Sequence, residues 1–284
     1  MVSKYEMSIQ TAVITGASTG IGAACALYLD RLGWRVFAGV RKPADGDALR
    51  QQASDRLTPL LLDVTDSAAI AAAAAAVTAA VGETGLTGLV NNAGIAQGGP
   101  LEFLPMADLR RQFEINVIGQ IAVTQAFLPL LRQGRGRVVN MGSVSGRVAM
   151  PFMGPYAASK FALEALTDSL RVELRPWGIH VAIIEPGPIA TPIWQKSLAT
   201  ADELSHALPP AGQTLYGAAI ARARQRLVSA SQAGSPAEAV ARVVAHALTA
   251  QRPQTRYPLG RGVRLAILFA RFTPDRLRDW LITR

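Results

Sequence analysis

The chain has 284 residues, of which 50% are hydrophobic and 17% are charged, a balance that suits a well-packed globular core. Its single cysteine, Cys25, cannot form an internal disulfide, and the three histidines are too scattered to indicate a metal site. The net charge of +9 could favour nucleic acid, a membrane surface or anionic ligands, but no nucleic-acid-binding motif accompanies it. We therefore expect neither a nucleic-acid partner nor a bound metal.

The start of the chain contains Lys4 and Glu6 and lacks the apolar segment of a secretory signal peptide. No stretch reaches about 18 uninterrupted apolar residues, so the sequence predicts no membrane span. We expect the protein to be cytoplasmic.

Short apolar runs alternate with helical patterns from the start of the chain to Pro186. Strands are expected at 12–15, 34–40, 58–62, 86–90, 137–141 and 179–184, and helices at 21–32, 66–81, 107–131 and 156–175. Several of these strands are apolar without alternation, which is typical of a parallel sheet covered on both faces. The sequence thus predicts an α/β fold: one domain spanning residues 1–284, with a Rossmann-type doubly wound parallel sheet, helices on both faces and a core at about 10–260.

The regular pattern lapses after Pro186. Residues 187–233 are rich in proline, glycine and serine, and a connection this long is usually functional or mobile, so we expect a substrate loop there. Ser235 is the expected N-cap of a helix that runs to about Ala250, followed by a strand at 255–259. The tail, 262–284, is basic and amphipathic. It could cover a pocket, join a dimer interface, rest on a membrane or pack on the body of the protein, and packing is the expectation we favour.

A glycine-rich turn, Gly16 to Gly22, lies between the first strand and the first helix. Glycines let a backbone turn tightly and approach a pyrophosphate, and the helix N-terminus offers free N–H groups and a positive dipole end. The position of this turn between a strand and a helix predicts a dinucleotide-binding site.

Tyr156 and Lys160 lie four positions apart, which places both on one face of the expected helix. A nearby ammonium favours phenolate and should lower the tyrosine pKa, so that the phenol can exchange a proton with an alcohol or carbonyl. The spacing alone is weak, because it recurs by chance in many helices.

Five motifs in order make the pattern specific. The spacing G-x-x-x-G-x-G is followed by Asp63-Val64, Asn91-Asn92-Ala93-Gly94, Asn116, Ser143 with Tyr156 and Lys160, and Pro186-Gly187 with Thr191. Over residues 10–250 the chain resembles the short-chain dehydrogenase/reductase family. Gly39-Val40-Arg41 and Arg256-Tyr257-Pro258-Leu259-Gly260 resemble, more weakly, its 17β-hydroxysteroid and retinol dehydrogenase branch.

This resemblance implies hydride transfer between a nicotinamide and a carbinol or carbonyl carbon, and commonly a homodimer or homotetramer. Tyr156 would be the general acid or base, Lys160 would lower its pKa and hold the nicotinamide ribose, Ser143 would bind the substrate oxygen, and Asn116 would support a relay water. The expected cofactor-binding residues are Gly16, Ser18, Thr19, Gly20, Ile21, Gly22, Arg41, Lys42, Asp63, Val64, Asn92, Ala93, Gly94, Tyr156, Lys160, Pro186, Gly187, Ile189 and Thr191.

The second strand ends in Arg41-Lys42, with no carboxylate before Asp45. An acidic residue there would bind the ribose 2′-OH of NAD, whereas a basic one accommodates the 2′-phosphate of NADP. The guanidinium fork of Arg41 suits phosphate, so the sequence favours NADP(H) over NAD(H).

The expected substrate wall is apolar and offers no fixed charge for a carboxylate, which favours a lipophilic carbonyl or secondary alcohol, such as a steroid or retinoid. Its candidates are Ser143, Val148, Phe152, Met153 and Trp194, with Ile95, Val144, Met150, Pro188 and Ile193 beside them. The alternatives are an NAD-dependent enzyme, a non-catalytic dinucleotide-binding regulator, and an epimerase or dehydratase on the same fold.

Overall fold

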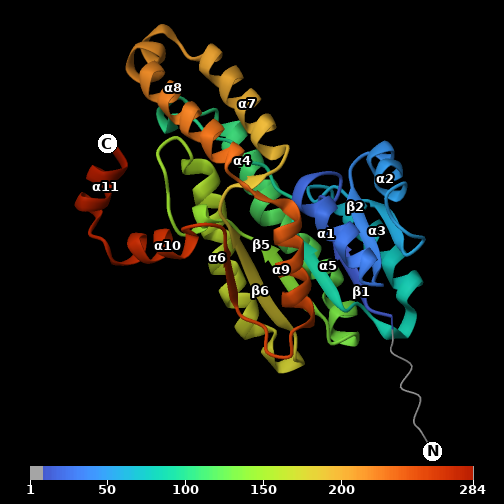
Figure 1. Cartoon of the computed structure of the whole chain (residues 1–284). Coiled ribbons are helices and arrows are strands. Elements are labelled where there is room, and N and C mark those ends of the chain that lie inside the picture. The colour runs from blue at the N-terminus through green and yellow to red at the C-terminus, as the bar shows by residue number, and fades with distance from the viewer. Residues whose placement is uncertain (1–8, 284) are drawn as a thin grey trace, which may run out of the picture.

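A computed structural model describes residues 9–283, apart from the side chains at 195, 196, 200, 204 and 283. Within these residues, seven strands form one sheet in the order β3-β2-β1-β4-β5-β6-β9, and every neighbouring pair is parallel (Figure 1). The strands are β1 (Thr11–Ile14), β2 (Arg35–Val40), β3 (Leu57–Leu61), β4 (Gly88–Asn91), β5 (Arg137–Met141), β6 (His180–Pro186) and β9 (Arg256–Leu259), with β7 (Ile189–Ala190) and β8 (Ser235–Pro236) paired separately.

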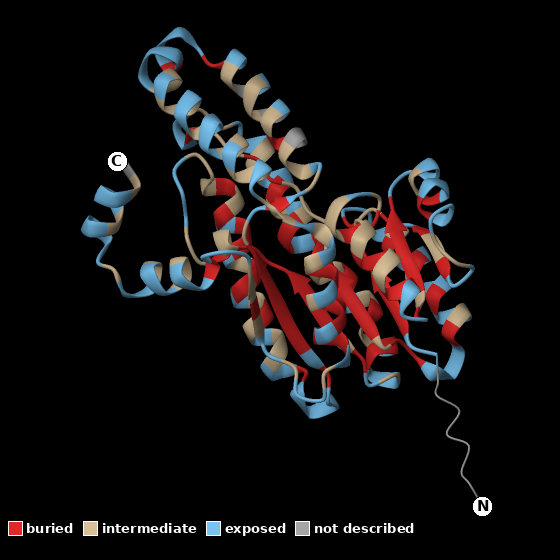
Figure 2. Cartoon of the chain, viewed as in Figure 1, coloured by how far each residue is buried: buried red, intermediate tan, exposed pale blue. Residues whose placement is uncertain are grey.

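Helices cover both faces of this sheet. The helices that the structure describes are α1 (Gly20–Arg31), α2 (Pro43–Arg50), α3 (Ser67–Val81), α4 (Met106–Phe113), α5 (Gly119–Gln133), α6 (Gly154–Glu173), α7 (Ile193–Ala207), α8 (Pro210–Gln232), α9 (Ala237–Thr249), α10 (Val263–Phe272) and α11 (Asp275–Thr283). The inner strands β2, β1, β4, β5 and β6 are almost wholly buried, the edge strands β3 and β9 are partly exposed, and the helices expose one side (Figure 2). The predicted doubly wound parallel α/β fold is therefore confirmed.

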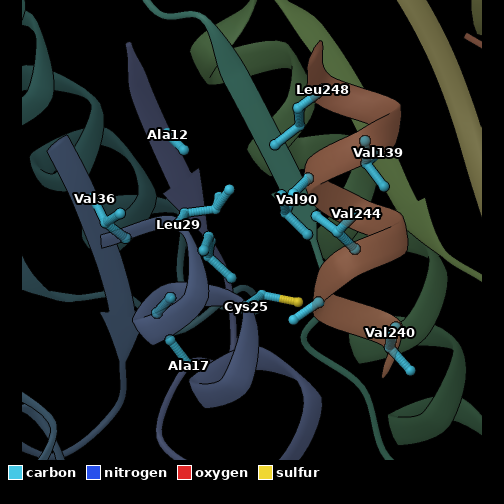
Figure 3. Close-up of a cluster of buried hydrophobic side chains, with 14 of the residues drawn as sticks. Ala12, Ala17, Cys25, Leu29, Val36, Val90, Val139, Val240, Val244 and Leu248 are labelled. Atoms are coloured by element: carbon cyan, nitrogen blue, oxygen red, sulfur yellow. The ribbon is translucent and has the colours of Figure 1, made fainter. Parts of the chain in front are cut away.

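One core lies between the sheet and helices α1 and α9. Cys25 and Leu29 of α1 pack there with Val240, Val244 and Leu248 of α9 (Figure 3). Cys25 is fully buried, and burial raises the pKa of its thiol to about 12, as expected for a reduced core residue. The second core, on the opposite face, is formed by α3, α5 and the end of α6 against the same strands.

Buried amides fasten the centre of the sheet to two helices. Asn91 on β4 donates from Nδ2 to the Thr124 hydroxyl (2.8 Å) and to Oδ1 of Asn140 on β5 (2.9 Å). Asn140 in turn donates to the Thr167 hydroxyl of α6 at 2.8 Å. These bonds hold α5 and α6 at a set position over β4 and β5, because breaking one would leave a buried donor without a partner.

Two helical stretches, Ser67–Thr84 and Met106–Gln133, are long and apolar enough to cross a membrane by length and composition, which is weak evidence of a span. Helices α3 and α5 within them contribute Val77 and Phe127 to the core under the sheet. Their apolar composition therefore has a role in covering the sheet.

The prediction of an irregular loop at 187–233 is wrong. Helices α7 and α8 occupy most of it and form a hairpin that projects beyond the sheet (Figure 1). The prolines precede or begin these helices: Pro192 and Pro209 are N-caps and Pro210 is the first residue of α8, where a missing N–H costs nothing. The sequence pattern also gave no indication of α2.

Two expectations about the last third of the chain are also corrected. Ser235 is not the N-cap of α9, because Ser235 and Pro236 pair with β7 and Pro236 precedes the helix. The tail packs on the body only in part: in α10 only Val263 is buried, while Leu265 and Phe272 are 72% and 73% exposed, and α11 meets α8 where Arg226 donates to the Ile282 carbonyl oxygen at 3.3 Å. Helices α10 and α11 extend away from the sheet (Figure 1).

Candidate active site

A cavity of about 520 Å³ opens at the carboxyl ends of the strands. The loops after β1, β2, β3, β4, β5 and β6 all contribute to its wall. This is the edge at which a doubly wound sheet binds ligands, beside the point where the strand order reverses between β1 and β4.

The glycine turn forms one end of this cavity, with Ser18, Thr19, Gly20 and Ile21 on the wall. Gly16 and Gly20 have φ of +64° and +61°, values that favour glycine. A Cβ on Gly22 would lie 2.2 Å from the Gly16 carbonyl oxygen, so no side chain fits there. The first turn of α1 carries no side-chain cap and no acidic residue, which leaves its N–H groups free for an anion. The turn therefore fits a dinucleotide pyrophosphate.

Asn92 locks this turn to the loop after β4. Its Nδ2 donates to the carbonyl oxygens of Thr15 (2.9 Å) and Gly16 (3.1 Å). The Thr15 hydroxyl accepts hydrogen bonds from the backbone N–H groups of Asn92 and Ala93, both at 2.9 Å. The two loops thus form one rigid wall, on which Gly94 also lies.

Arg41 lines the cavity at the end of β2, next to Asp63 and Val64 at the end of β3. Burial raises the pKa of Asp63, but hydrogen bonds from Thr65 and the charge of Arg41 outweigh it and hold that pKa below its ordinary value. Lys42 is exposed, precedes α2 and does not contribute to the wall, so of the two expected basic residues only Arg41 faces the cavity.

Ser143, Tyr156 and Lys160 lie together on the opposite wall. Ser143 follows β5 and caps a short turn by accepting the Ser145 N–H at 3.1 Å, so it has a structural contact as well as a place in the cavity. Lys160, one turn after Tyr156 on α6, is buried and donates from Nζ to the Met141 carbonyl oxygen at 2.7 Å. Its Nζ is 5.8 Å from the centre of the Tyr156 ring.

The expected lowering of the Tyr156 pKa is not what the protein alone produces. Burial raises this pKa, and a hydrogen bond with the Ser143 hydroxyl opposes the rise. Burial also lowers the pKa of Lys160 to about 8, against the attraction of Glu164. Burial is thus the dominant influence on the Tyr156 phenol, while the Lys160 ammonium donates to the Met141 carbonyl oxygen.

Asn116 does not line the cavity but supports it from behind. It lies in a π-helical turn, Glu114–Ile118, between α4 and α5. Its side chain pairs with both backbone groups of Ile95 at 2.8 Å and donates to the Ser159 hydroxyl at 3.0 Å. Ser159 donates to the Tyr156 carbonyl oxygen at 2.7 Å, so Asn116 links the loop after β4 to the helix that carries Tyr156.

On the remaining wall, Pro186, Gly187, Ile189 and Thr191 line the cavity as expected. Met153 and Trp194 line its outer part, and the Trp194 ring is held by a hydrogen bond from Nε1 to the Ile189 carbonyl oxygen at 2.7 Å. Ile95, Val144, Met150, Pro188 and Ile193 also contribute to this wall.

A second, mainly apolar cavity of about 460 Å³ adjoins the first under α7 and α8. Ala96, Met150, Met153, Ser197 and Leu227 line both. Phe152 lines only the second cavity, and Val148 lines neither of the two, so Val148 is not brought to the site.

A family profile described as short chain dehydrogenase matches residues 10–202. The chain belongs to the short-chain dehydrogenase family. Of this family, retinol dehydrogenase 5 from Mus musculus is 43% identical over 95% of this chain and 86% of its own length. The 17-beta-hydroxysteroid dehydrogenase type 6 from Bos taurus is 38% identical over 95% of this chain and 87% of its own length. The resemblance to this branch is thus confirmed.

Among solved structures, a short chain dehydrogenase from Burkholderia cenocepacia in complex with NADP matches with a TM-score of 0.71. It is 27% identical, and the match covers 97% of this chain and 98% of that chain. This short-chain dehydrogenase is accordingly an oxidoreductase with a nicotinamide dinucleotide cofactor, and the cavity described above fits such a group.

Sequence reasoning missed an ion network behind the site. Arg256, on the last strand, lies 3.2 Å from Glu164 and 3.6 Å from Glu185, and Arg147 lies 3.6 Å from Glu164. Glu164 and Glu185 are almost fully buried, and Glu164 is one turn after Lys160. Only the fold brings these residues together, so no local pattern could have revealed them. Gln97 and Arg111, which also line the cavity, were missed for the same reason.

Glu164 makes the stability of this enzyme depend on pH. Burial and the charge of Glu185 raise the pKa of Glu164 to about 7, against Arg256 and Arg147. A raised carboxyl pKa means that the folded state holds the proton more tightly than the unfolded state. This proton binding stabilises the fold fully below about pH 4.5, and the stabilisation is lost as the pH rises through 7. Between pH 5 and 8, the free energy of unfolding should fall more for the wild type than for Glu164→Gln. The difference should be on the order of 2–3 kcal/mol, from about 1.4 kcal/mol per pKa unit. Parallel pH curves in urea denaturation would contradict the assignment.

Proposed function

We propose that this short-chain dehydrogenase transfers a hydride between NADP(H) and a lipophilic carbonyl or secondary alcohol. The observation that carries the proposal is the meeting of Ser143, Tyr156 and Lys160 on one wall of a cavity that has Arg41 at one end and an apolar extension at the other. The names of the retinol and hydroxysteroid dehydrogenase relatives support a retinoid or steroid as the first compounds to test.

The nicotinamide, when bound, supplies or accepts the hydride. The Ser143 hydroxyl hydrogen-bonds the substrate oxygen and fixes its distance from the phenol. Tyr156 donates its proton to that oxygen during reduction and removes it during oxidation. The pKa of the phenol is raised by burial, so Tyr156 holds its proton in the free enzyme, as a general acid must.

Lys160, with Nζ 5.8 Å from the centre of the Tyr156 ring, supplies protons to the site. Its pKa of about 8 lets the ammonium exchange protons near neutral pH. Its bond to the Met141 carbonyl holds Nζ at the carboxyl end of β5, where it can also bind the nicotinamide ribose. Asn116 would support a relay water indirectly, because it holds the loop after β4 through both backbone groups of Ile95.

Replacing Tyr156 by Phe should lower kcat by about 10²–10⁴, because general acid–base catalysis is typically worth that much. The cofactor Kd should change little, since the phenyl ring keeps its packing. Steady-state kinetics and titration of protein fluorescence with NADPH measure the two effects. Tyr28→Phe, outside the cavity, is the matched control, and near-normal turnover by Tyr156→Phe would overturn the mechanism.

Arg41→Asp should shift the cofactor preference from NADP(H) toward NAD(H). The variant removes a fork suited to the 2′-phosphate and places a carboxylate where a ribose 2′-OH would bind. Lys42→Asp makes the same change of charge one residue away, off the cavity wall, and should shift the preference far less. Titrations of both cofactors measure the four Kd values, and tighter binding of NAD(H) than NADP(H) by the wild type would refute the proposal.

A panel of carbonyls and alcohols separates the alternatives. Retinoid and steroid turnover with NADPH or NADP supports the proposal, and turnover only with NAD(H) favours the NAD-dependent alternative. Binding without turnover indicates a dinucleotide-binding regulator. Loss of a sugar-nucleotide substrate without net cofactor oxidation indicates an epimerase or dehydratase.

We further propose that the tail rests on a membrane surface while the enzyme remains cytoplasmic and homo-oligomeric. Exposed apolar side chains and several arginines on α10 and α11 support the membrane contact. Phe272→Asp should weaken co-sedimentation with anionic lipid vesicles by about tenfold, from the roughly 1.5–3 kcal/mol of a buried phenylalanine. Leu32→Asp, at an exposed apolar site on the body, should not weaken it. Equal binding by both variants, or no binding by the wild type, would exclude the tail as the contact.

A further inference from the structure

The second, mainly apolar cavity under α7 and α8, here called the outer cavity, gives the site more room than a small carbonyl compound needs. It adds about 460 Å³ beyond the cavity that holds Tyr156, and residues from four separate segments line both spaces. Ala96 follows β4, Met150 and Met153 precede α6, and Ser197 and Leu227 belong to α7 and α8. The two cavities are therefore neighbours with a common wall, and a molecule that reacts at Tyr156 could extend into the outer one.

The interior of the outer cavity is apolar. Small and aliphatic side chains of α8, such as Ala219, Ala223 and Leu227, face it, opposite Phe152 and Pro100 from the two loops below. The loops are fixed to each other, because the Gly99 N–H donates to the Phe152 carbonyl oxygen at 2.7 Å. Phe152 also packs edge-on against Tyr216 of α8, with ring centres 6.4 Å apart. Such a wall binds hydrocarbon and offers little to a polar substrate body.

The charges on this cavity are almost all positive. Arg222, Arg224 and Arg226 line it, and Asp202 is its one carboxylate among the described residues. Asp202 is already paired with Arg224 through two bonds of 2.7 and 3.0 Å. Arg226 donates to the Ile282 carbonyl oxygen of α11 at 3.3 Å. In the part of the chain that the structure describes, no carboxylate lies within ion-pair distance of Arg222 or Arg226, which are one helical turn apart on α8.

We propose that the outer cavity binds the remote part of an elongated amphipathic substrate, an apolar body that ends in an acidic group held by Arg222 and Arg226. This rests on the proposed carbonyl or alcohol chemistry at Tyr156 and names the class of substrate more closely. The exposed guanidinium groups of Arg222 and Arg226 can bind the acidic end of the substrate. The apolar interior of the outer cavity disfavours any charge on the rest of the substrate.

The first test measures binding without turnover. Isothermal titration of the enzyme with bound NADP would compare a saturated long-chain carboxylate with the alcohol of the same length. The wild type should bind the carboxylate more tightly, and added salt should weaken only that ligand. In the double variant Arg222→Met/Arg226→Met the carboxylate Kd should rise about tenfold and the alcohol Kd should stay unchanged, because Met keeps much of the apolar stem. Arg242→Met, on an exposed site of α9, is the control.

The second test places a side chain in the cavity. Ala223→Trp narrows it, whereas Ala221→Trp, two residues away, is exposed and does not line it. With NADPH, the wild type should reduce a long-chain ω-oxo carboxylate better than its methyl ester. Ala223→Trp should lower kcat/KM for both long substrates by at least tenfold and leave a short cyclic ketone unaffected, and thermal melting would confirm that both variants fold.

The outcomes separate this inference from the proposed function. A carboxylate Kd that does not respond to the arginine substitutions overturns the inference, whatever the turnover. Equal effects of Ala223→Trp and Ala221→Trp also overturn it. Arginine-dependent carboxylate binding without reduction of any carbonyl supports the acidic-ligand site and refutes the proposed reaction.

Discussion

The cofactor cavity depends on one close approach of backbone, where the start of α1 meets the ends of β1 and β4. Gly22 can have no Cβ there, because it would overlap the Gly16 carbonyl and the Asn92 amide. Four hydrogen bonds from Asn92 and Ala93 to Thr15 and Gly16 then join the loops that follow the two strands. This clamp holds the helix N-terminus at the reversal of strand order, and a pyrophosphate can be bound only because no side chain occupies that space.

The reacting groups are held by a different part of the structure. Buried amides join β4 and β5 to α5 and α6, and Asn116 joins the loop after β4 to Ser159. Both sets of bonds converge on α6, which carries Tyr156 and Lys160, while Arg256 reaches the same helix from the last strand. Helix α6 is thereby fixed from three sides, so the phenol keeps its position relative to Ser143 although the cavity in front of it is open.

The sequence predicts those features that residues close together in the chain determine. Apolar runs revealed the six strands β1 to β6, and the position of the glycine-rich turn between a strand and a helix predicted one wall of the cavity. Local reasoning failed where distant residues decide the outcome. The ion pair of Glu164 with Arg256 joins residues 92 positions apart, and the pKa of Tyr156 is set by burial in the folded chain and by the Ser143 hydroxyl. Helices α7 and α8 were missed because their prolines were read as breaks, although Pro210 occupies a first turn.

The proposed reaction and the proposed substrate contacts use different parts of the structure. Ser143, Tyr156 and Lys160 lie at the sheet edge, whereas the outer cavity is roofed by α7 and α8, which pack mainly on each other. Helix α8 contacts the rest of the protein through a few side chains: Tyr216 donates to Glu102 at 2.7 Å and packs edge-on against Phe103. A change in the roof can therefore alter which molecule enters without moving Ser143, Tyr156 or Lys160. Arg222 and Arg226 belong to this part, which is why we use their charge to propose a class of substrate rather than a reaction.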